Sequence, residues 1–344
     1  MKNLLKVFVY LAATILWIPG EGLKAQNTAP DYKIANKIQL PGDGGWDYLA
    51  VDETGGRVFV SHGMVVQVVD LKTKALAGTI EDTKGVHGIA LAYDLNKGYI
   101  SNGRDTSVTV FDLKTLKFLL RIKITGMNPD AILYDPFSRH VFTFNGRTSN
   151  STVIDATTDK VVGTIALDGK PEFSQTDGKG RVYVNIEDKS EISVIDSKAM
   201  KVEKSWSIAP GEEPSGLALD NENHRLFSVC GNKLMVVSDA VTGKVVASVP
   251  IGDRCDGVAF DPGKKLAYSS NGEGTMTIVR QKDKDNYEVV GTFQTQPGAR
   301  TIAVDKKSHD LYLTTASYEA PAAQGQRPAM KPNSFVLLEI ESLK

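Results

Sequence analysis

The heptapeptide PSGLALD, residues 214–220, decides the fold, because closely related segments recur along the whole chain. The related segments are WDYLAVD (46–52), VHGIALA (86–92), PDAILYD (129–135), PEFSQTD (171–177), CDGVAFD (255–261) and ARTIAVD (299–305). Successive copies begin 40 to 44 residues apart. Such regular spacing indicates one structural unit that is repeated seven times.

Each copy is followed by the same series of segments. A polar turn such as ETGGR (53–57) leads to an aromatic-centred run such as VFVSH (58–62). A second turn leads to a run such as VTVFD (108–112), and a last turn to a run such as KVVGTIAL (160–167). Val, Ile and aromatic residues in the runs, with Gly, Asn, Asp and Lys between them, are typical of strands joined by tight turns. Each repeat is therefore predicted to form four short strands.

Seven units of four antiparallel strands predict an all-β fold, a seven-bladed β-propeller. A single twisted blade cannot cover its own faces, so blades stack on one another until the ring closes. The last repeat ends at SFVLLEIESLK (334–344), which supplies only its third strand, while DYKIANKIQL (31–40) has the pattern of an outer strand. We therefore expect the N-terminal strand to complete the last blade, with residues 26–344 forming one propeller domain.

The first 25 residues have the pattern of a secretory signal peptide. A basic start, MKNLLK, precedes an apolar run at 7–18 and a small residue, Ala25, that suits cleavage. That run is too short to span a bilayer, and no other segment could span one. We therefore expect a periplasmic or secreted protein, and a monomer. The net charge is −1 and the chain has no concentrated basic segment, so we expect no nucleic-acid partner.

The repeats resemble the YVTN-repeat propellers, also called YncE-like proteins. The resemblance lies in the pattern P-x-G-[IL]-A-[LV]-D, then G-K-x-[LV]-[YF]-V-x-N-G, then V-x-V-[IV]-D-x-x-T-G-K-V-V-x-T-I, and it covers about residues 31–344. It implies the propeller fold and an exported protein, but no particular reaction, because many members have no assigned activity. The chain departs from the pattern at PEFSQTD (171–177) and in a long segment at 316–334, which we expect to form a loop over one mouth of the channel.

In an up-and-down blade, the start of the first strand and the hairpin after the second strand lie at the same mouth of the channel. The second residue of each repeat forms a first ring: Asp47, His87, Asp130, Glu172, Ser215, Asp256 and Arg300. The ends of the second strands form a second ring: His62, Asn102, Asn145, Asn185, Cys230, Asn271 and Thr315. The hairpin tips beyond them carry Arg104, Arg147, Glu187, Lys233 and Glu273. The first ring varies in an otherwise regular repeat, which favours a functional role for this mouth.

We predict that this mouth makes the chain a ligand-binding or protein-interaction module for a small polar molecule or a peptide. The predicted ligand-binding residues are Trp46, Asp47, His62, His87, Asn102, Arg104, Asp130, Asn145, Arg147, Glu172, Asn271, Glu273 and Arg300. The Trp offers a stacking face, and the Arg side chains can bind carboxylates or phosphates. An Asn followed by Gly is also typical of tight turns, so a turn role and a ligand role both stay open for the three Asn residues.

His62 and His87 are expected to lie near each other, with Asp47 and Asp130 on either side. Such a group can hold a divalent metal or act as an acid–base pair, but its spacing matches no metal motif. We therefore predict ligand contact, with no metal and no cofactor. The alternative is a lyase or a lactonase-like hydrolase that uses a His and carboxylates at this mouth, with or without a metal. The sequence has no nucleophile-elbow, zincin, P-loop or dinucleotide motif, so catalysis stays open.

The chain has two cysteines: Cys230 ends the second strand of one repeat and Cys255 begins the next, so they are expected to lie at the same mouth, in the same relation as His62 and His87. An exported protein meets an oxidising compartment, where such a pair could form a disulfide. The sequence leaves this pairing open.

Overall fold

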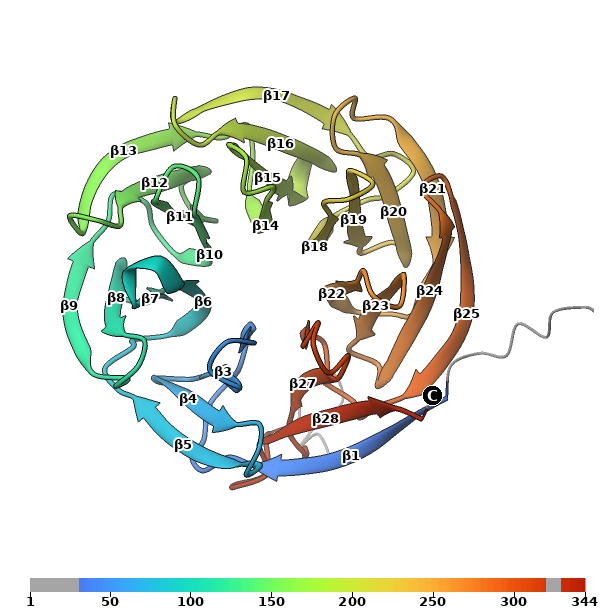
Figure 1. Ribbon diagram of the computed structural model, residues 1–344, viewed down its shortest axis with the longest axis horizontal. Coiled ribbons are helices and arrows are strands. Elements are labelled where there is room, and N and C mark those ends of the chain that lie inside the picture. Colours follow the sequence, from blue (N-terminus) through green and yellow to red (C-terminus); the bar gives the residue numbers. More distant parts are fainter. Residues whose placement is uncertain (1–30, 320–328, 344) are drawn as a thin grey trace, which may run out of the picture.

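The computed structural model describes residues 31–319 and 329–343, so the predicted signal peptide at 1–25 lies outside the described residues. In the described part, 28 strands form seven four-stranded antiparallel sheets, set as blades around a central opening (Figure 1). The predicted seven-bladed propeller is confirmed. Among the described residues, no helix is both long enough and apolar enough to cross a membrane.

The strands of each blade follow one another from the channel to the rim. Blade 1 comprises β2 (Leu49–Asp52), β3 (Arg57–His62), β4 (Val65–Asp70) and β5 (Ala75–Ile80). Blade 2 comprises β6 (Val86–Ala92), β7 (Lys97–Asn102), β8 (Ser107–Asp112) and β9 (Phe118–Lys123). Blade 3 comprises β10 (Pro129–Asp135), β11 (His140–Asn145), β12 (Asn150–Asp155) and β13 (Lys160–Ala166). Blade 4 comprises β14 (Pro171–Thr176), β15 (Arg181–Ile186), β16 (Glu191–Asp196) and β17 (Lys201–Ser207).

The remaining blades follow the same order. Blade 5 comprises β18 (Pro214–Asp220), β19 (Arg225–Cys230), β20 (Leu234–Asp239) and β21 (Val245–Pro250). Blade 6 comprises β22 (Cys255–Asp261), β23 (Leu266–Asn271), β24 (Thr275–Asp283) and β25 (Asn286–Gln294). Blade 7 comprises β26 (Ile302–Val304), β27 (Leu311–Thr315), β28 (Val336–Ser342) and β1 (Tyr32–Gln39). Two single-turn 3-10 helices, η1 (Tyr93–Leu95) and η2 (Glu187–Lys189), lie in loops.

Burial explains why strands of different composition occupy different places in a blade. The middle strand β19 is buried at every position, because neighbouring blades cover both of its faces. The outer strand β17 has the sequence KVEKSWS and alternates between exposed and half-buried residues, because its outward side chains meet water. The apolar core of the ring therefore lies between blades rather than within one.

Glycine at the third position of some repeats lets the innermost strands approach closely. A Cβ added at Gly216 would lie 2.8 Å from the carbonyl oxygen of Asp256 in the next blade. A Cβ at Gly257 would lie 2.9 Å from the backbone nitrogen of Ile302. A larger residue would push these strands apart, so the glycines keep the channel narrow where the first ring lies.

The ring closes as predicted, with β1 antiparallel to β28 on the outside of blade 7 (Figure 1). Glu339 of β28 is fully buried and accepts hydrogen bonds from Nδ2 of Asn36 at 2.7 Å and from the Tyr312 hydroxyl at 3.1 Å. Its carboxylate also forms an ion pair with Lys74, from the turn between β4 and β5. One buried carboxylate thus joins both ends of the described chain to blade 1.

Candidate functional site

The structure brings the first ring together around the channel, because its members occupy the same place in every blade. His87 near the start of β6 donates a hydrogen bond from Nδ1 to Oδ2 of Asp47 at 2.6 Å. The same nitrogen lies 3.5 Å from Oδ1 of Asp130 in β10. The three side chains are only 29%, 15% and 19% exposed, respectively. Blades 1, 2 and 3 therefore contribute one acid–His–acid group to one mouth.

A second group in the ring is centred on Arg300, just before β26. Its Nε donates to Oδ2 of Asp256 at 2.7 Å, and its terminal nitrogen donates to the carbonyl oxygen of Trp46 at 2.9 Å. The same nitrogen lies 3.8 Å from Oδ1 of Asp47. This Arg therefore links blades 6, 7 and 1, and its charge is shared between two carboxylates.

A third group contains Lys170, a residue that the sequence reasoning missed. Its ammonium lies 2.8 Å from Oε1 of Glu172 and forms a second ion pair with Glu187 at the hairpin tip. The sequence does place Lys170 two residues before Glu172 of the first ring, and its long side chain can extend past Pro171 to that residue.

Burial and crowding of carboxylates raise the pKa values of three acids in the ring, Asp130, Glu172 and Asp256. Burial and the charge of Asp47 raise the pKa of Asp130 to about 7, and burial and the charge of Asp130 raise that of Glu172 to about 8. Burial alone would lower the pKa of His87, but its hydrogen bond with Asp47 and the charge of Asp130 outweigh burial and raise it to about 9. Burial also raises the pKa of Asp256. The ring thus has more carboxyl groups than its cations can compensate, which favours the protonated forms of Asp130 and Glu172.

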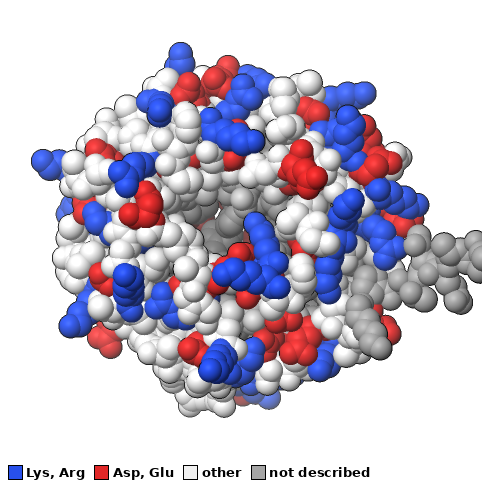
Figure 2. Space-filling view, in the orientation of Figure 1, with Lys and Arg blue, Asp and Glu red and all other residues white. Residues whose placement is uncertain are grey.

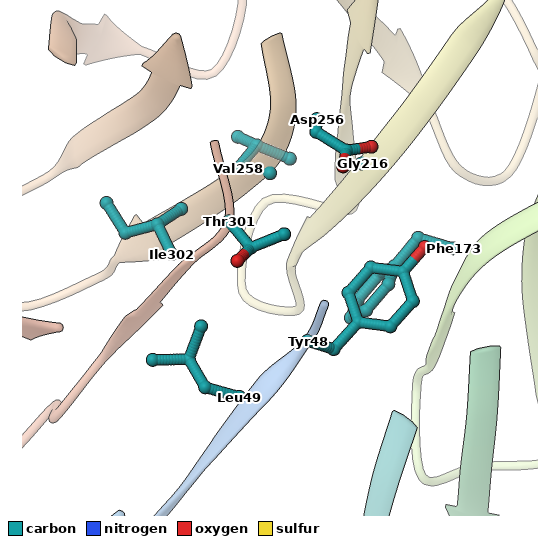
Figure 3. Close-up of a pocket in the computed structure, with 9 residues that line it drawn as sticks. Tyr48, Leu49, Phe173, Gly216, Asp256, Val258, Thr301 and Ile302 are labelled. Carbon is teal, nitrogen blue, oxygen red and sulfur yellow. The ribbon is translucent and has the colours of Figure 1, made fainter. Parts of the chain in front are cut away.

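Figure 2 shows one face of the ring, hollowed at its centre, with basic and acidic side chains around the opening. Inside the channel, the Tyr48 and Phe173 rings pack with centroids 4.8 Å apart. They line a cavity of about 20 Å³ that Asp256, Val258 and Ile302 also line (Figure 3). That volume suits about one water molecule. The two aromatic rings therefore narrow the channel below the charged ring.

A larger cavity of about 160 Å³ extends from Phe173 toward the opposite mouth. Its walls are mainly apolar and include Leu219, Phe260 and Val304. Among the described residues, Lys306 is the one charged residue that lines it, so this part of the channel is much less charged than the mouth that carries the first ring.

The three Asn residues predicted to bind ligand, Asn102, Asn145 and Asn271, are buried and serve the hairpins. The Asn102 amide donates to Ser107 and Thr109 at 3.0 and 2.9 Å, and the Asn271 amide donates to Thr275 and Thr277, both at 3.0 Å. Asn145 makes the corresponding bonds to Asn150 and Thr152, at 2.8 and 3.1 Å. These amides hold the second and third strands together at the mouth.

His62 is placed differently from the expectation that it would lie beside His87. Its ring stacks on Phe335 with centroids 4.0 Å apart, and its Nδ1 lies 3.1 Å from Oε1 of Gln67. It is 2% exposed, and burial lowers its pKa. The apolar face of Phe335 and the Gln67 amide draw it into the seam between blades 7 and 1, so the acid–His–acid group contains His87 alone.

Trp46 is 6% exposed and packs against Phe335 and Tyr318, with centroids 5.3 and 6.3 Å away. Its ring is therefore covered by its neighbours. Tyr318 belongs to the long segment at 316–334 and pairs with Met330, while residues 320–328 of that segment lie outside the described residues. The described flanks of the expected loop thus lie beside the mouth.

The hairpin-tip residues Arg104, Arg147 and Glu273 are exposed. Arg104 lies over Gly85, with its guanidinium 3.9 Å from Sδ of Met64, and Glu273 accepts a hydrogen bond from Thr275 at 2.8 Å. Within residues 31–319 and 329–343, neither Arg side chain forms an ion pair with an acidic residue. They flank the mouth rather than enter the ring.

Cys230 and Cys255 are free thiols in the structure. The Cys255 thiol donates to the carbonyl oxygen of Cys230 at 3.1 Å, while the Cys230 thiol points toward the carbonyl oxygen of Ser228 at 3.7 Å. Burial raises both thiol pKa values to about 12. The two thiols thus point at backbone carbonyls, and the disulfide left open by the sequence is not formed.

No protein-family model matches the chain. The chain is 23% identical to the uncharacterized protein YncE of Salmonella typhimurium, over 73% of this chain and 76% of YncE. It is 28% identical to antigen Lp49 of Leptospira interrogans over 51% of this chain, and this match spans only 40% of Lp49. In structure it resembles hydrazine synthase of Kuenenia stuttgartiensis, with a TM-score of 0.67, 20% identity, and coverage of 80% of this chain and 94% of that one. That last likeness concerns the fold alone. The chain is therefore a seven-bladed β-propeller similar in sequence to YncE, as its repeats predicted.

Proposed function

We propose that this chain is an exported ligand-binding propeller whose charged mouth takes a positively charged ligand. The observation that carries the proposal is the charge balance of the ring. Its acidic members are Asp47, Asp130, Glu172 and Asp256, against the cations His87, Arg300 and Lys170. Lys170 is also shared with Glu187 at the hairpin tip. A cationic ligand would supply the additional positive charge that the four carboxyl groups need in order to ionise together.

The raised pKa values support the same sign of charge. Burial raises the pKa of Asp130 and Glu172 because their ionised forms have too little compensation. A ligand with a cationic group would favour those ionised forms, whereas an anionic ligand would add to the repulsion. The exposed Arg104 and Arg147 lie outside the ring and leave this balance unchanged.

The sign of the ligand charge can be tested by thermal denaturation of metal-free protein in EDTA. We expect small amines such as putrescine, agmatine or arginine amide to raise the melting temperature, and succinate or citrate to leave it unchanged. Glu172→Gln should abolish the amine effect. The matched control is Glu203→Gln, the same substitution in the outer strand β17. Stabilisation by carboxylates but not by amines would contradict the proposal, and so would an amine effect that survives Glu172→Gln.

The alternative of a lyase or lactonase-like hydrolase at this mouth keeps one supporting observation. The 2.6 Å hydrogen bond from His87 to Asp47 orients the imidazole, as acid–base catalysis needs. Turnover of ester or lactone substrates that is lost in His87→Gln, and retained in a His140→Gln control at the opposite turns, would favour it over simple binding.

A further inference from the structure

The acid–His–acid group has the separations of a metal-binding site. The candidate ligand atoms of Asp47, His87 and Asp130 all lie within 4.8 Å of one another. Two ligands about 2.0–2.1 Å from a tetrahedral ion lie roughly 3.3 Å apart. Nδ1 of His87 and Oδ1 of Asp130 are 3.5 Å apart, close to that value. The 2.6 Å contact between His87 and Asp47 is a hydrogen bond, and it would lengthen once an ion replaces its proton.

An independent observation is that the Asp130 carboxylate is incompletely satisfied. Its Oδ1 atom is buried and has no hydrogen-bond partner. Buried polar atoms are nearly always paired, so an atom of this kind needs an explanation such as an unseen ion. This is the same oxygen that faces Nδ1 of His87.

The backbone of the two acidic residues and the imidazole of His87 are also held in place by their surroundings. Oγ of Ser101 donates to the carbonyl oxygen of Asp130 at 2.5 Å, and Thr301 donates to that of Asp47 at 2.7 Å. On the far side of the imidazole, a Cβ added at Gly103 would lie 2.6 Å from Nε2 of His87. The glycine therefore allows a close contact that turns Nδ1 toward the two acids. Such preorganisation is what a metal site requires.

We propose that Asp47, His87 and Asp130 hold a first-row divalent metal ion, such as Zn²⁺, at the mouth of the channel. The inference rests on the proposed function, since it names the cation that the ring takes. One imidazole with two carboxylates suits zinc, manganese or iron better than magnesium or calcium. Metal ligands must be deprotonated, so the proton in the hydrogen bond between His87 and Asp47 would leave when the ion binds.

The site would keep coordination positions open to the channel. His87 is 29% exposed, and three protein ligands converge there among the described residues. Metal sites with three protein ligands usually hold water or a substrate atom at the next position. Water or a polar group of a small molecule in the channel would bind the ion at that position, next to Arg300 and Glu172 of the ring.

The test is zinc binding by untagged full-length protein, stripped with EDTA, measured by isothermal titration calorimetry and by elemental analysis after dialysis. We expect one Zn²⁺ per chain, and a loss of affinity of at least about 100-fold in both His87→Gln and Asp130→Asn. The matched control is His309→Gln. His309 also pairs with an Asp, Asp261, at 2.7 Å, but it belongs to no three-ligand group among the described residues.

Each outcome decides between the hypotheses. Absence of stoichiometric zinc, or zinc retained in a folded Asp130→Asn variant, would overturn the metal site. If His87→Gln fails to fold, the conclusion rests on Asp130→Asn. Asn has nearly the same shape as Asp, and Oδ1 of Asp130 accepts no hydrogen bond that the exchange would break. If amines stabilise the metal-free protein while zinc does not bind, the metal inference fails and the proposed function stands. If neither binds, both fail.

Discussion

Glu339 and Lys74 form the ion pair that holds the closing blade against blade 1, and their burial is unequal. The Glu339 side chain is fully buried, whereas that of Lys74 is 31% exposed. The carboxylate has two further donors, Asn36 at 2.7 Å and Tyr312 at 3.1 Å. We predict that Lys74→Met destabilises the propeller more than Glu339→Gln, although both substitutions break the same ion pair.

The expected loss in the free energy of unfolding depends on which charge each substitution leaves without its partner. Lys74→Met leaves a buried carboxylate with two neutral donors, and removal of one partner of a buried pair costs about 3–5 kcal/mol. Glu339→Gln leaves an ammonium that water can reach, so the cost is that of weakened hydrogen bonds, about 1–3 kcal/mol. We therefore expect the free energies of unfolding of the two variants to differ by about 2 kcal/mol.

The assay is urea unfolding near pH 7, followed by tryptophan fluorescence, for both single variants and the double variant. Lys33→Met is the matched control, because it breaks the Lys33–Glu341 pair between β1 and β28 of the closing blade, where the side chains are 52% and 36% exposed. We expect it to cost less than about 1 kcal/mol. Equal losses from Lys74→Met and Glu339→Gln, or a larger loss from the latter, would refute the reasoning.

Three further predictions concern the channel and the thiols. The pKa of Glu172 is raised to about 8 from its ordinary 4.5. Its protonated form therefore contributes stability that is fully present below about pH 4.5 and is lost as the pH rises through 8. Urea unfolding should therefore show Glu172→Gln gaining stability relative to the native chain between about pH 5 and 9, and a constant difference would contradict this. Gly216→Ala, whose Cβ would lie 2.8 Å from a neighbouring carbonyl oxygen, should lower the free energy of unfolding by about 1–3 kcal/mol. Gly146→Ala, whose nearest neighbouring atom would be 3.6 Å away, should be far milder, and equal losses would speak against the close approach of blades. Cys230 and Cys255 should react with a thiol reagent only after unfolding, because burial raises their pKa values; rapid labelling of the folded protein would show the opposite.

Much of the fold could be predicted because its determinants are local and recur. Each strand is specified by a short apolar run, and each turn by Gly, Asn, Asp or Lys at the break. Counting strands also predicted that the segment at 31–40 completes blade 7, since an unpaired outer strand at one end of the chain needs a partner from the other. The sequence also predicted that the first-ring residues lie together at one mouth of the channel, because they occupy equivalent positions in stacked units.

The candidate site was less predictable, because equivalent positions do not reveal contacts. His62 and His87 occupy neighbouring blades, but packing on Phe335 draws one of them into the seam. Lys170 lies outside the first ring by its position in the repeat, yet its long side chain reaches Glu172 and Glu187.

The sequence by itself determined the number of blades, their order, the closing strand and the mouth of the channel at which the charged residues gather. These features follow from hydrophobic patterning, which is local and repeats with each unit. Only the tertiary structure decided which charges pair: Arg300 with Asp256, and His87 between Asp47 and Asp130. Such pairing depends on side-chain conformation and on distances across the channel between residues far apart in the chain. Burial there also shifts the protonation of the acids, on which the proposed binding of a cation depends.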